Sequence, residues 1–181
     1  MNKVIYCDGS SDGKTGGKGG WGYVILVDGV KVYEANGSEN SATNNSMEIR
    51  GAIEGLKYTA SYLATKPVVC GALREVILRS DSQLMLGYAS GRYRCKAMHL
   101  LPLYLELKKL FSNLNAKDEW VKGHAGDTYN EQCDKLAKAA RESKDDKART
   151  LSECEGKVSD GSRSTDQVTK KTSAKISWDN S

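Results

Sequence analysis

Four acidic residues are spaced so that their side chains could act together on a phosphate group. Two of them, Asp8 and Asp81, each follow a short apolar run, VIYC and VILRS, that predicts a buried strand. In sheets with helical connections, functional groups gather beyond the carboxyl ends of the strands. If the two strands are neighbours, their carboxylates face each other, and they must share cations or one must hold a proton.

The other two acids, Glu48 and Asp134, lie on segments with helical periodicity. Glu48 falls in the first turns of a helix, beside small residues (Gly51, Ala52 and Gly55) that would let this helix approach the sheet. Asp134 lies at the border of the inner face of the last helix, in NEQCDKLAKAARE, and Asn130 is one turn earlier on the same side.

Each acid alone has an ordinary alternative. Asp8 and Asp81 could cap turns, Glu48 could be a solvated helix charge, and Asp134 could pair with Lys138. Four acids converging on one end of a sheet predict a site for Mg²⁺ instead, because hard cations take oxygen ligands. Two such ions, about 3.5–4 Å apart, can clamp the attacking and leaving oxygens of a phosphoryl displacement.

The elements that must position these acids follow from the hydrophobic pattern. Strands and helices are expected in the order β-β-β-α-β-α-α-β-α, which predicts an α/β fold with a mixed sheet. Asp28-Gly29 predicts a hairpin. The glycine-rich loop 13–20 lacks the ending of a phosphate-binding P-loop, so we interpret it as the connection between the first two strands. The expected elements are strands at 4–7, 21–27, 30–38, 74–81 and 118–124 and helices at 44–63, 82–90, 99–111 and 130–142.

Composition divides the 181 residues into a domain at 1–142 and a tail at 143–181. The tail holds eight basic and seven acidic residues with few apolar ones, so we expect it to be disordered. The net charge of +4 permits a polyanionic partner without demanding one. We find no signal peptide and no apolar run long enough for a membrane span, and five cysteines without a CxxC pair favour a reducing, cytoplasmic compartment over disulfides or zinc.

Four segments together resemble the signature of a known nuclease family. They are DGS at 8–10, TNNSME at 43–48, SDSQ at 80–83 and WVKGHAGDTYNEQCDKLA at 120–137. In this order and spacing they are similar to the type 1 ribonuclease H family (ribonuclease HI) over residues 1–142. The resemblance implies a ribonuclease H-like mixed five-stranded sheet with helices packed on both faces. It also implies endonucleolytic hydrolysis of the RNA strand of RNA–DNA hybrids, leaving 5′-phosphate and 3′-hydroxyl ends.

The resemblance also implies roles for single residues. Asp8 would bridge two Mg²⁺ ions (Mn²⁺ is an alternative), Glu48 and Asp81 would help to hold one, and Asp134 would hold the other. His124 would assist proton movement or product release; alternatively it is an ordinary surface loop histidine. The substrate-binding set consists of Gly9, Ser10, Thr43, Asn44, Asn45, Gln83 and Asn130. Amide side chains among these can reach base edges and sugars, and contact with 2′-hydroxyls distinguishes RNA from DNA. Thr43 or Asn44 could also cap the helix.

The chain departs from the family where many members carry a basic, tryptophan-rich protrusion. Here that region is the compact GRYRCKAMHL, with Arg92, Arg94 and Lys96 as its basic residues and Tyr93 as a candidate stacking group. We therefore expect weaker binding to the hybrid than in members with the protrusion. We also expect the protein to act as a monomer. The alternatives are a non-cleaving hybrid-binding module of the same fold, a detached reverse-transcriptase domain, a resolvase and a structural protein. GHAG followed by Asn130 and Asp134 argues against the resolvase.

Overall fold

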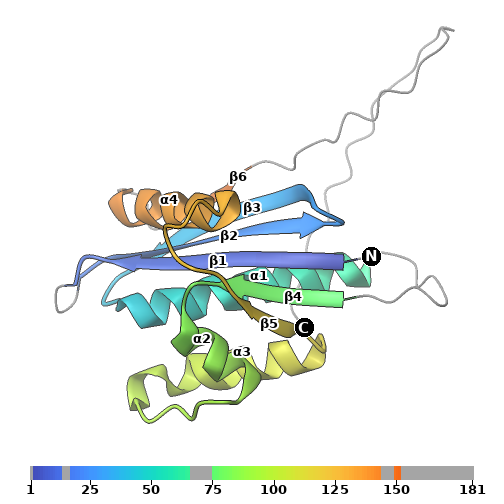
Figure 1. Ribbon diagram of the computed structural model, residues 1–181. Coiled ribbons are helices and arrows are strands. Elements are labelled where there is room, and N and C mark those ends of the chain that lie inside the picture. The colour runs from blue at the N-terminus through green and yellow to red at the C-terminus, as the bar shows by residue number, and fades with distance from the viewer. Residues whose placement is uncertain (1, 14–16, 66–74, 144–148, 152–181) are drawn as a thin grey trace, which may run out of the picture.

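The structure is a computed structural model that describes residues 2–13, 17–65, 75–143 and 149–151. Its elements follow the predicted order, with a short 3₁₀ helix and one strand in addition (Figure 1). They are β1 (Asn2–Ser11), β2 (Gly19–Val27), β3 (Val30–Glu39), α1 (Asn44–Ala64), β4 (Glu75–Ser80), α2 (Gln83–Ser90), η1 (Met98–Leu100), α3 (Leu101–Asn113), β5 (Lys117–Trp120), α4 (Thr128–Glu142) and β6 (Arg149–Leu151).

The strands form one mixed sheet with helices on both faces. Its order is β5-β4-β1-β2-β3-β6, in which β1 pairs parallel with β4 and antiparallel with β2. α4 covers one face across β1, β2 and β3, while α1 packs on the other face with α2 and α3 beyond it (Figure 1). The predicted α/β class and mixed sheet are confirmed.

The sixth strand, β6, lies inside the segment that we expected to be disordered. Its three residues pair antiparallel with residues 34–36 of β3, at the edge of the sheet. An edge strand offers unpaired backbone groups to any extended segment nearby, which local sequence pattern does not reveal. Apart from β6 and Ser143, the tail at 143–181 lies outside the described residues, so the prediction for it stays a prediction.

The first strand is longer than the sequence predicted. We expected it to end in a turn at residues 8–10, but β1 continues to Ser11 and Asp8 lies within it. The parallel ladder with β4 stops at Tyr6 and Arg79, while the antiparallel ladder with β2 continues to Ser11 and Gly19. The strand therefore keeps a partner on one side after it has lost the partner on the other, and Asp8 stands where β4 has ended.

The two hairpin connections lie where they were predicted. Asp28 and Gly29 join β2 to β3 with φ of +49° and +83°, the left-handed pair that a tight two-residue hairpin requires. β1 and β2 are joined through the glycine-rich segment, of which residues 14–16 lie outside the described residues.

Close approach of the helices to the sheet depends on small residues. The inner face of α1 is buried through Ile49, Ala52, Ile53 and Leu56, as predicted, and that of α4 through Cys133, Ala137 and Ala140. A side chain at Gly22 of β2 would collide with the backbone and side chains of α4. Of the described cysteines, Cys7, Cys95 and Cys133 are free. Among the described helices, none has the length and apolarity to cross a membrane.

Candidate active site

The sheet brings Asp8 and Asp81 to the same end of two adjacent strands. Tyr6 and Arg79 are register partners, and each aspartate lies two residues further along its own strand direction. Tyr6 and Asp8, two apart in β1, project to the same face, which is the face that α4 covers, and Asp81 directly follows the last residue of β4. The condition set by the sequence, that the two strands be neighbours, is met.

Asp8 is the electrostatic centre of the group. The pKa of its carboxyl is raised from 3.8 to about 7, mainly by burial and then by the charges of Asp81, Asp134 and Glu48, in that order of strength. A hydrogen bond from the backbone N–H of Gly9 to Oδ1, at 2.7 Å, acts in the opposite direction. The three other predicted acids therefore all act on Asp8 through space, so the fold has gathered the four carboxylates at one place.

Glu48 reaches the site from the first turns of α1, and two side chains hold it. Thr43 is the N-cap of the helix and forms a capping box with Ser46, so the capping alternative raised by the sequence is correct for Thr43. Asn44 donates to Glu48 Oε1 at 3.2 Å, and the Ser82 hydroxyl donates to Oε2 at 2.5 Å. Burial raises the pKa of Glu48, while the bond from Ser82 lowers it.

α1 can deliver Glu48 because Gly9 has no side chain. A Cβ at Gly9 would lie 2.2 Å from the backbone nitrogen of Glu48, closer than two such atoms can approach. The first turns of α1 thus rest directly on β1, one residue after Asp8. Gly9, predicted as a substrate contact, has this packing role in the structure.

Asp81 is held from three sides. Its Oδ2 accepts from the Asn130 amide at 3.2 Å, and its backbone carbonyl accepts from the Trp120 indole at 3.0 Å. A Cβ at Gly123 would lie 2.4 Å from Oδ2, so a larger residue there would displace the Asp81 carboxylate. Asn130, predicted to bind substrate, is 3% exposed and serves Asp81, while its own Oδ1 is buried without a protein partner.

Asp134 lies on α4 and forms an ion pair with Lys138. The Lys138 ammonium is 2.7 Å from Asp134 Oδ2, one helical turn away. The ordinary alternative weighed for this acid is therefore present in the structure, and the charge of Asp134 still acts on Asp8. Within the described residues, no three His, Cys, Asp or Glu side chains are grouped tightly enough to hold a metal ion as they stand.

His124 occupies the exposed loop between β5 and α4. Its φ is +52°, a left-handed conformation that is uncommon outside glycine. The loop ends at Asp127, which caps α4 by accepting from the backbone N–H groups of Tyr129 and Asn130, each at 3.1 Å. His124 directly follows Gly123, the residue of this loop whose backbone approaches the Asp81 carboxylate.

The remaining predicted substrate contacts fall into two groups. Thr43, Asn45 and Gln83 are exposed at or next to the N-termini of α1 and α2, on the side of Glu48 and Ser82. Ser10 is 7% exposed, and its hydroxyl accepts from Arg141 of α4 at 2.8 Å. The first group is available to a ligand, whereas Ser10 is engaged within the protein.

Sequence reasoning missed Ser82, Trp120 and Gly123 as direct neighbours of the acids. Ser82 lies in the SDSQ motif at an N-cap position, where a hydroxyl is typical, so its second bond to Glu48 could have been suspected. The contact of Trp120 depends on the pairing of β4 with β5, which the sequence does not show.

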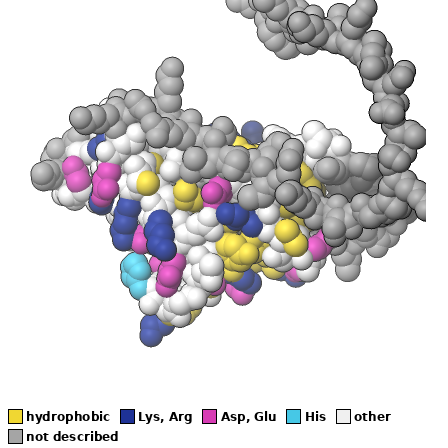
Figure 2. All heavy atoms as spheres, turned by 90° about the horizontal axis from the view of Figure 1, so that it is seen from above, with side chains coloured by type: hydrophobic (Ala, Val, Ile, Leu, Met, Phe, Trp, Pro, Cys, Tyr) yellow, Lys and Arg dark blue, Asp and Glu magenta, His cyan; other side chains and the backbone are white. Residues whose placement is uncertain are grey.

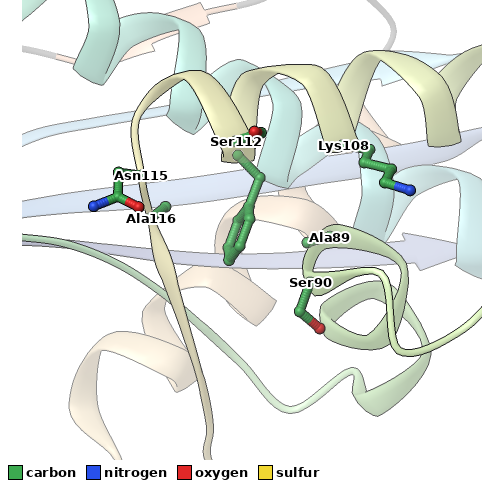
Figure 3. Close-up of a pocket in the computed structure, with 7 residues that line it drawn as sticks. Ala89, Ser90, Lys108, Ser112, Asn115 and Ala116 are labelled. Carbon is green, nitrogen blue, oxygen red and sulfur yellow. The ribbon is translucent and has the colours of Figure 1, made fainter.

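A surface depression lies away from these acids. It has a volume of about 270 Å³ between the C-terminal ends of α2 and α3, and Lys108 and Phe111 are among its walls (Figure 3). No carboxylate lines it, and two helix C-termini there carry partial negative charge. It offers nothing for phosphoryl chemistry.

Comparisons with known proteins agree with this geometry. The family model described as RNase H matches residues 1–142. The chain is 34% identical over 153 residues to the Ribonuclease H of Treponema denticola, covering 76% of this chain and 95% of that protein. It is also 34% identical to the Ribonuclease H of Geotalea uraniireducens, covering 78% and 95%.

Solved structures show the same fold. The N-terminal RNase H domain of a Mycobacterium tuberculosis protein, solved as a maltose-binding protein fusion, matches with a TM-score of 0.64 at 31% identity, covering 78% of this chain and 94% of that one. RNase H1 from Halobacterium salinarum matches with a TM-score of 0.63 at 25% identity, covering 77% and 97%. The chain therefore belongs to the RNase H family, as a type 1 ribonuclease H, an endoribonuclease.

Proposed function

We propose that this protein hydrolyses the RNA strand of RNA–DNA hybrids with two divalent cations held by Asp8, Glu48, Asp81 and Asp134, leaving 5′-phosphate and 3′-hydroxyl ends. The catalytic domain in this proposal is residues 1–142, and the enzyme acts as a cytoplasmic monomer. The observation that carries the proposal is the shared position of the acids: β1 and β4 bring Asp8 and Asp81 to one end of the sheet, and the close approach of α1 to Gly9 brings Glu48 there.

The acids fit a cation because the charges of Asp81, Asp134 and Glu48 all act on the buried carboxyl of Asp8 and raise its pKa. A positive charge among these acids would favour the ionised form of Asp8. Mg²⁺, with Mn²⁺ as an alternative, suits an all-oxygen donor set that leaves room for water and phosphate. When bound, such ions would supply an activated water and charge stabilisation at the departing 3′ oxygen. Lys138 would release Asp134 for this purpose.

The protein's own groups then have separate tasks. Asn44 and Ser82 orient Glu48, while Asn130 and Gly123 fix Asp81. His124 is exposed beside the site, where an imidazole can accept or deliver a proton at a phosphate or leaving oxygen. Its exposure lets it move protons between the site and solvent.

The hybrid would lie across the N-termini of α1 and α2, where Thr43, Asn45 and Gln83 are exposed. Next to Gln83 is an open depression of about 210 Å³ with Tyr93, 46% exposed, and Trp120, 50% exposed, among its walls. Half-exposed aromatic rings offer surfaces on which bases or sugars stack. A fold neighbour, LC11-RNase H1, was solved in complex with an RNA/DNA hybrid, with a TM-score of 0.64 at 22% identity.

Electrostatic attraction to the hybrid is modest. Arg92, one of the three basic residues that stand in place of the protrusion, is paired with Asp118 at 2.5 Å. Basic and acidic side chains are interspersed over the described part of the α4 face (Figure 2). Because phosphate contacts dominate affinity for nucleic acid and few basic side chains in this region of the described structure are free to make them, we expect weak binding with a shallow salt dependence.

One experiment tests the proposal and its alternative, a non-cleaving hybrid-binding module. A hybrid labelled on the RNA strand is incubated with the protein, with and without Mg²⁺, beside single-stranded RNA and duplex DNA. We expect Mg²⁺-dependent cutting of the hybrid alone, with 5′ ends sensitive to phosphatase. Tight binding without cutting at any Mg²⁺ or Mn²⁺ concentration would favour the binding module, and equal cutting of duplex DNA would sink the assigned specificity.

A further inference from the structure

A polar cluster lies one strand repeat before the carboxylates, on the same face of the sheet. Tyr6 and Arg79 are register partners on β1 and β4, two residues before Asp8 and Asp81. The Arg79 guanidinium lies over the Tyr6 ring, 5.1 Å from its centroid, and Nη1 donates to the Tyr6 hydroxyl at 2.5 Å. Nη2 pairs at 2.6 Å with Glu119 of β5. The cluster thus joins the three strands at the site end of the sheet.

The same hydroxyl connects the sheet to α4. Tyr6 is 3% exposed, and its hydroxyl donates to Asp127 Oδ2 in a long bond of 3.4 Å. The other oxygen of Asp127 caps α4 through Tyr129 and Asn130, and the Tyr129 ring packs 5.5 Å from the Tyr6 ring.

The hydrogen bond between Tyr6 and Asp127 affects residues of the candidate active site. Asn130, whose backbone N–H is held by Asp127, donates its side-chain amide to Asp81. The loop that carries His124 ends at Asp127. Both the support of Asp81 and the end of the histidine loop therefore depend on where the first turn of α4 sits above β1.

We propose that Tyr6, Arg79 and Asp127 are positioning residues, a hydrogen-bonded network that sets the first turn of α4 against β1 and β4. Through that turn they place Asn130 against Asp81 and anchor the His124 loop. None of the three faces the phosphate; each acts through another residue. The kinetic part of this inference rests on the proposed function, while the structural part does not.

The test uses two substitutions that leave packing and capping intact. Tyr6→Phe keeps the ring and removes the hydroxyl. Asp127→Ser keeps an N-cap oxygen, which serine provides well, and removes the second oxygen that faces Tyr6. The matched control is Tyr104→Phe on α3, which deletes the same hydroxyl on the opposite face of the sheet.

We expect each substitution to lower kcat on the hybrid by about ten-fold, within the 10²-fold that a misplacement of about 1 Å can cost, with little change in KM. The double variant should be no slower than the worse single variant, because the two groups act in one connection. If Tyr6→Phe has the same kcat as the parent protein and as the control Tyr104→Phe, the hydroxyl has no positioning role and the inference is overturned.

Hydrogen exchange supplies a readout that does not depend on cleavage. In Tyr6→Phe, the backbone amides of Tyr129 and Asn130 should exchange faster, because the carboxylate that accepts from them is less constrained. Tyr104→Phe should leave them unchanged. If the parent protein fails to cleave hybrids, faster exchange in Tyr6→Phe still supports the network while the proposed function fails; unchanged exchange would refute the network whatever the activity.

Discussion

Two parts of the site are built in different ways. Asp8, Glu48 and Asp134 lie on a strand and two helices, Asp81 directly follows β4, and Glu48 and Asp81 are each held by at least two neighbouring groups. His124 lies in an exposed loop with a backbone φ of +52°. Groups on regular elements keep their geometry without a ligand, whereas loop residues can adjust to one. We therefore expect the acids to act as a fixed charge cluster and the histidine to move protons to and from it.

The sharpest way to break this comparison is Asp8→Asn. We expect kcat to fall by more than the roughly 10³-fold that loss of one electrostatic contact costs, because both proposed cations would lose a carboxylate ligand. The protein should still fold, since Asn keeps the shape and can still accept from Gly9. Steady-state cleavage of the hybrid and circular dichroism measure both; turnover near that of the parent would show that the charge cluster is misassigned.

The same variant should change stability in a pH-dependent way. The folded pKa of Asp8, about 7, lies above its ordinary value of 3.8, so the folded state binds the proton more tightly than the unfolded chain. The protonated group therefore stabilises the folded state at low pH. The free energy of unfolding falls by on the order of 4 kcal/mol as the pH rises from about 4 to 7.

Without divalent ions, Asp8→Asn should therefore melt higher than the parent at pH 7.5, by several degrees as an order of magnitude, and the difference should shrink towards pH 5. Thermal melts in EDTA at about pH 5 and pH 7.5 measure this. A difference that grows at low pH would mean that the four carboxylates do not repel one another.

His124→Ala tests the loop half of the comparison. A proton-handling group contributes about 10²–10⁴-fold, so turnover should slow without vanishing, and Mg²⁺ affinity should stay within about two-fold. Burst and steady-state kinetics would separate chemistry from product release. Complete loss of cleavage with intact metal binding would contradict this prediction and show that His124 is as essential for cleavage as the acids are predicted to be.

A smaller effect is expected from the ion pair on α4. Lys138→Met removes an ammonium that competes with a cation for Asp134, so the dissociation constant for Mg²⁺ should fall by about two- to five-fold, as expected for an exposed helix pair. Lys135→Met, at an exposed lysine of the same helix, is the control in calorimetric titration. Equal effects of the two variants would show that general charge, not this pair, is responsible.

The smallest effect should follow deletion of residues 145–181. All proposed catalytic groups precede this segment, so kcat should change by less than about two-fold. The deletion removes the three-residue pairing of β6 with β3, so the melting temperature should fall by no more than a few degrees. A tenfold loss of turnover at matched salt would mean that the segment contributes to the site.

Much of the fold was predictable from local pattern. Period-two and period-3.6 hydrophobicity located the strands and helices of residues 1–142, because each element buries one face. Asp28-Gly29 predicted the hairpin, since its backbone conformation favours these residue types. The four acids were found from the motifs, which carry residue type and spacing together.

Other features depended on which strands pair. The continuation of β1 past Asp8 and the contact of Trp120 with Asp81 follow from the sheet order, which no local window contains. The roles of Gly9 and Gly123 as close-approach positions follow from neighbours that are distant in sequence. The burial of Asn130 beside Asp81 has the same origin.

The sequence by itself therefore determined the chemistry: four carboxylates, a histidine, and the elements that carry them. Only the tertiary structure decided how those groups are supported, because hydrogen bonds such as Ser82 to Glu48 and Tyr6 to Asp127 join residues that are far apart along the chain. Hydrophobic periodicity shows which side of an element is buried. The hydrogen-bond partner of a given side chain depends instead on the strand register and on where each helix packs on the sheet. Those quantities exist only once the sheet and its helices have assembled.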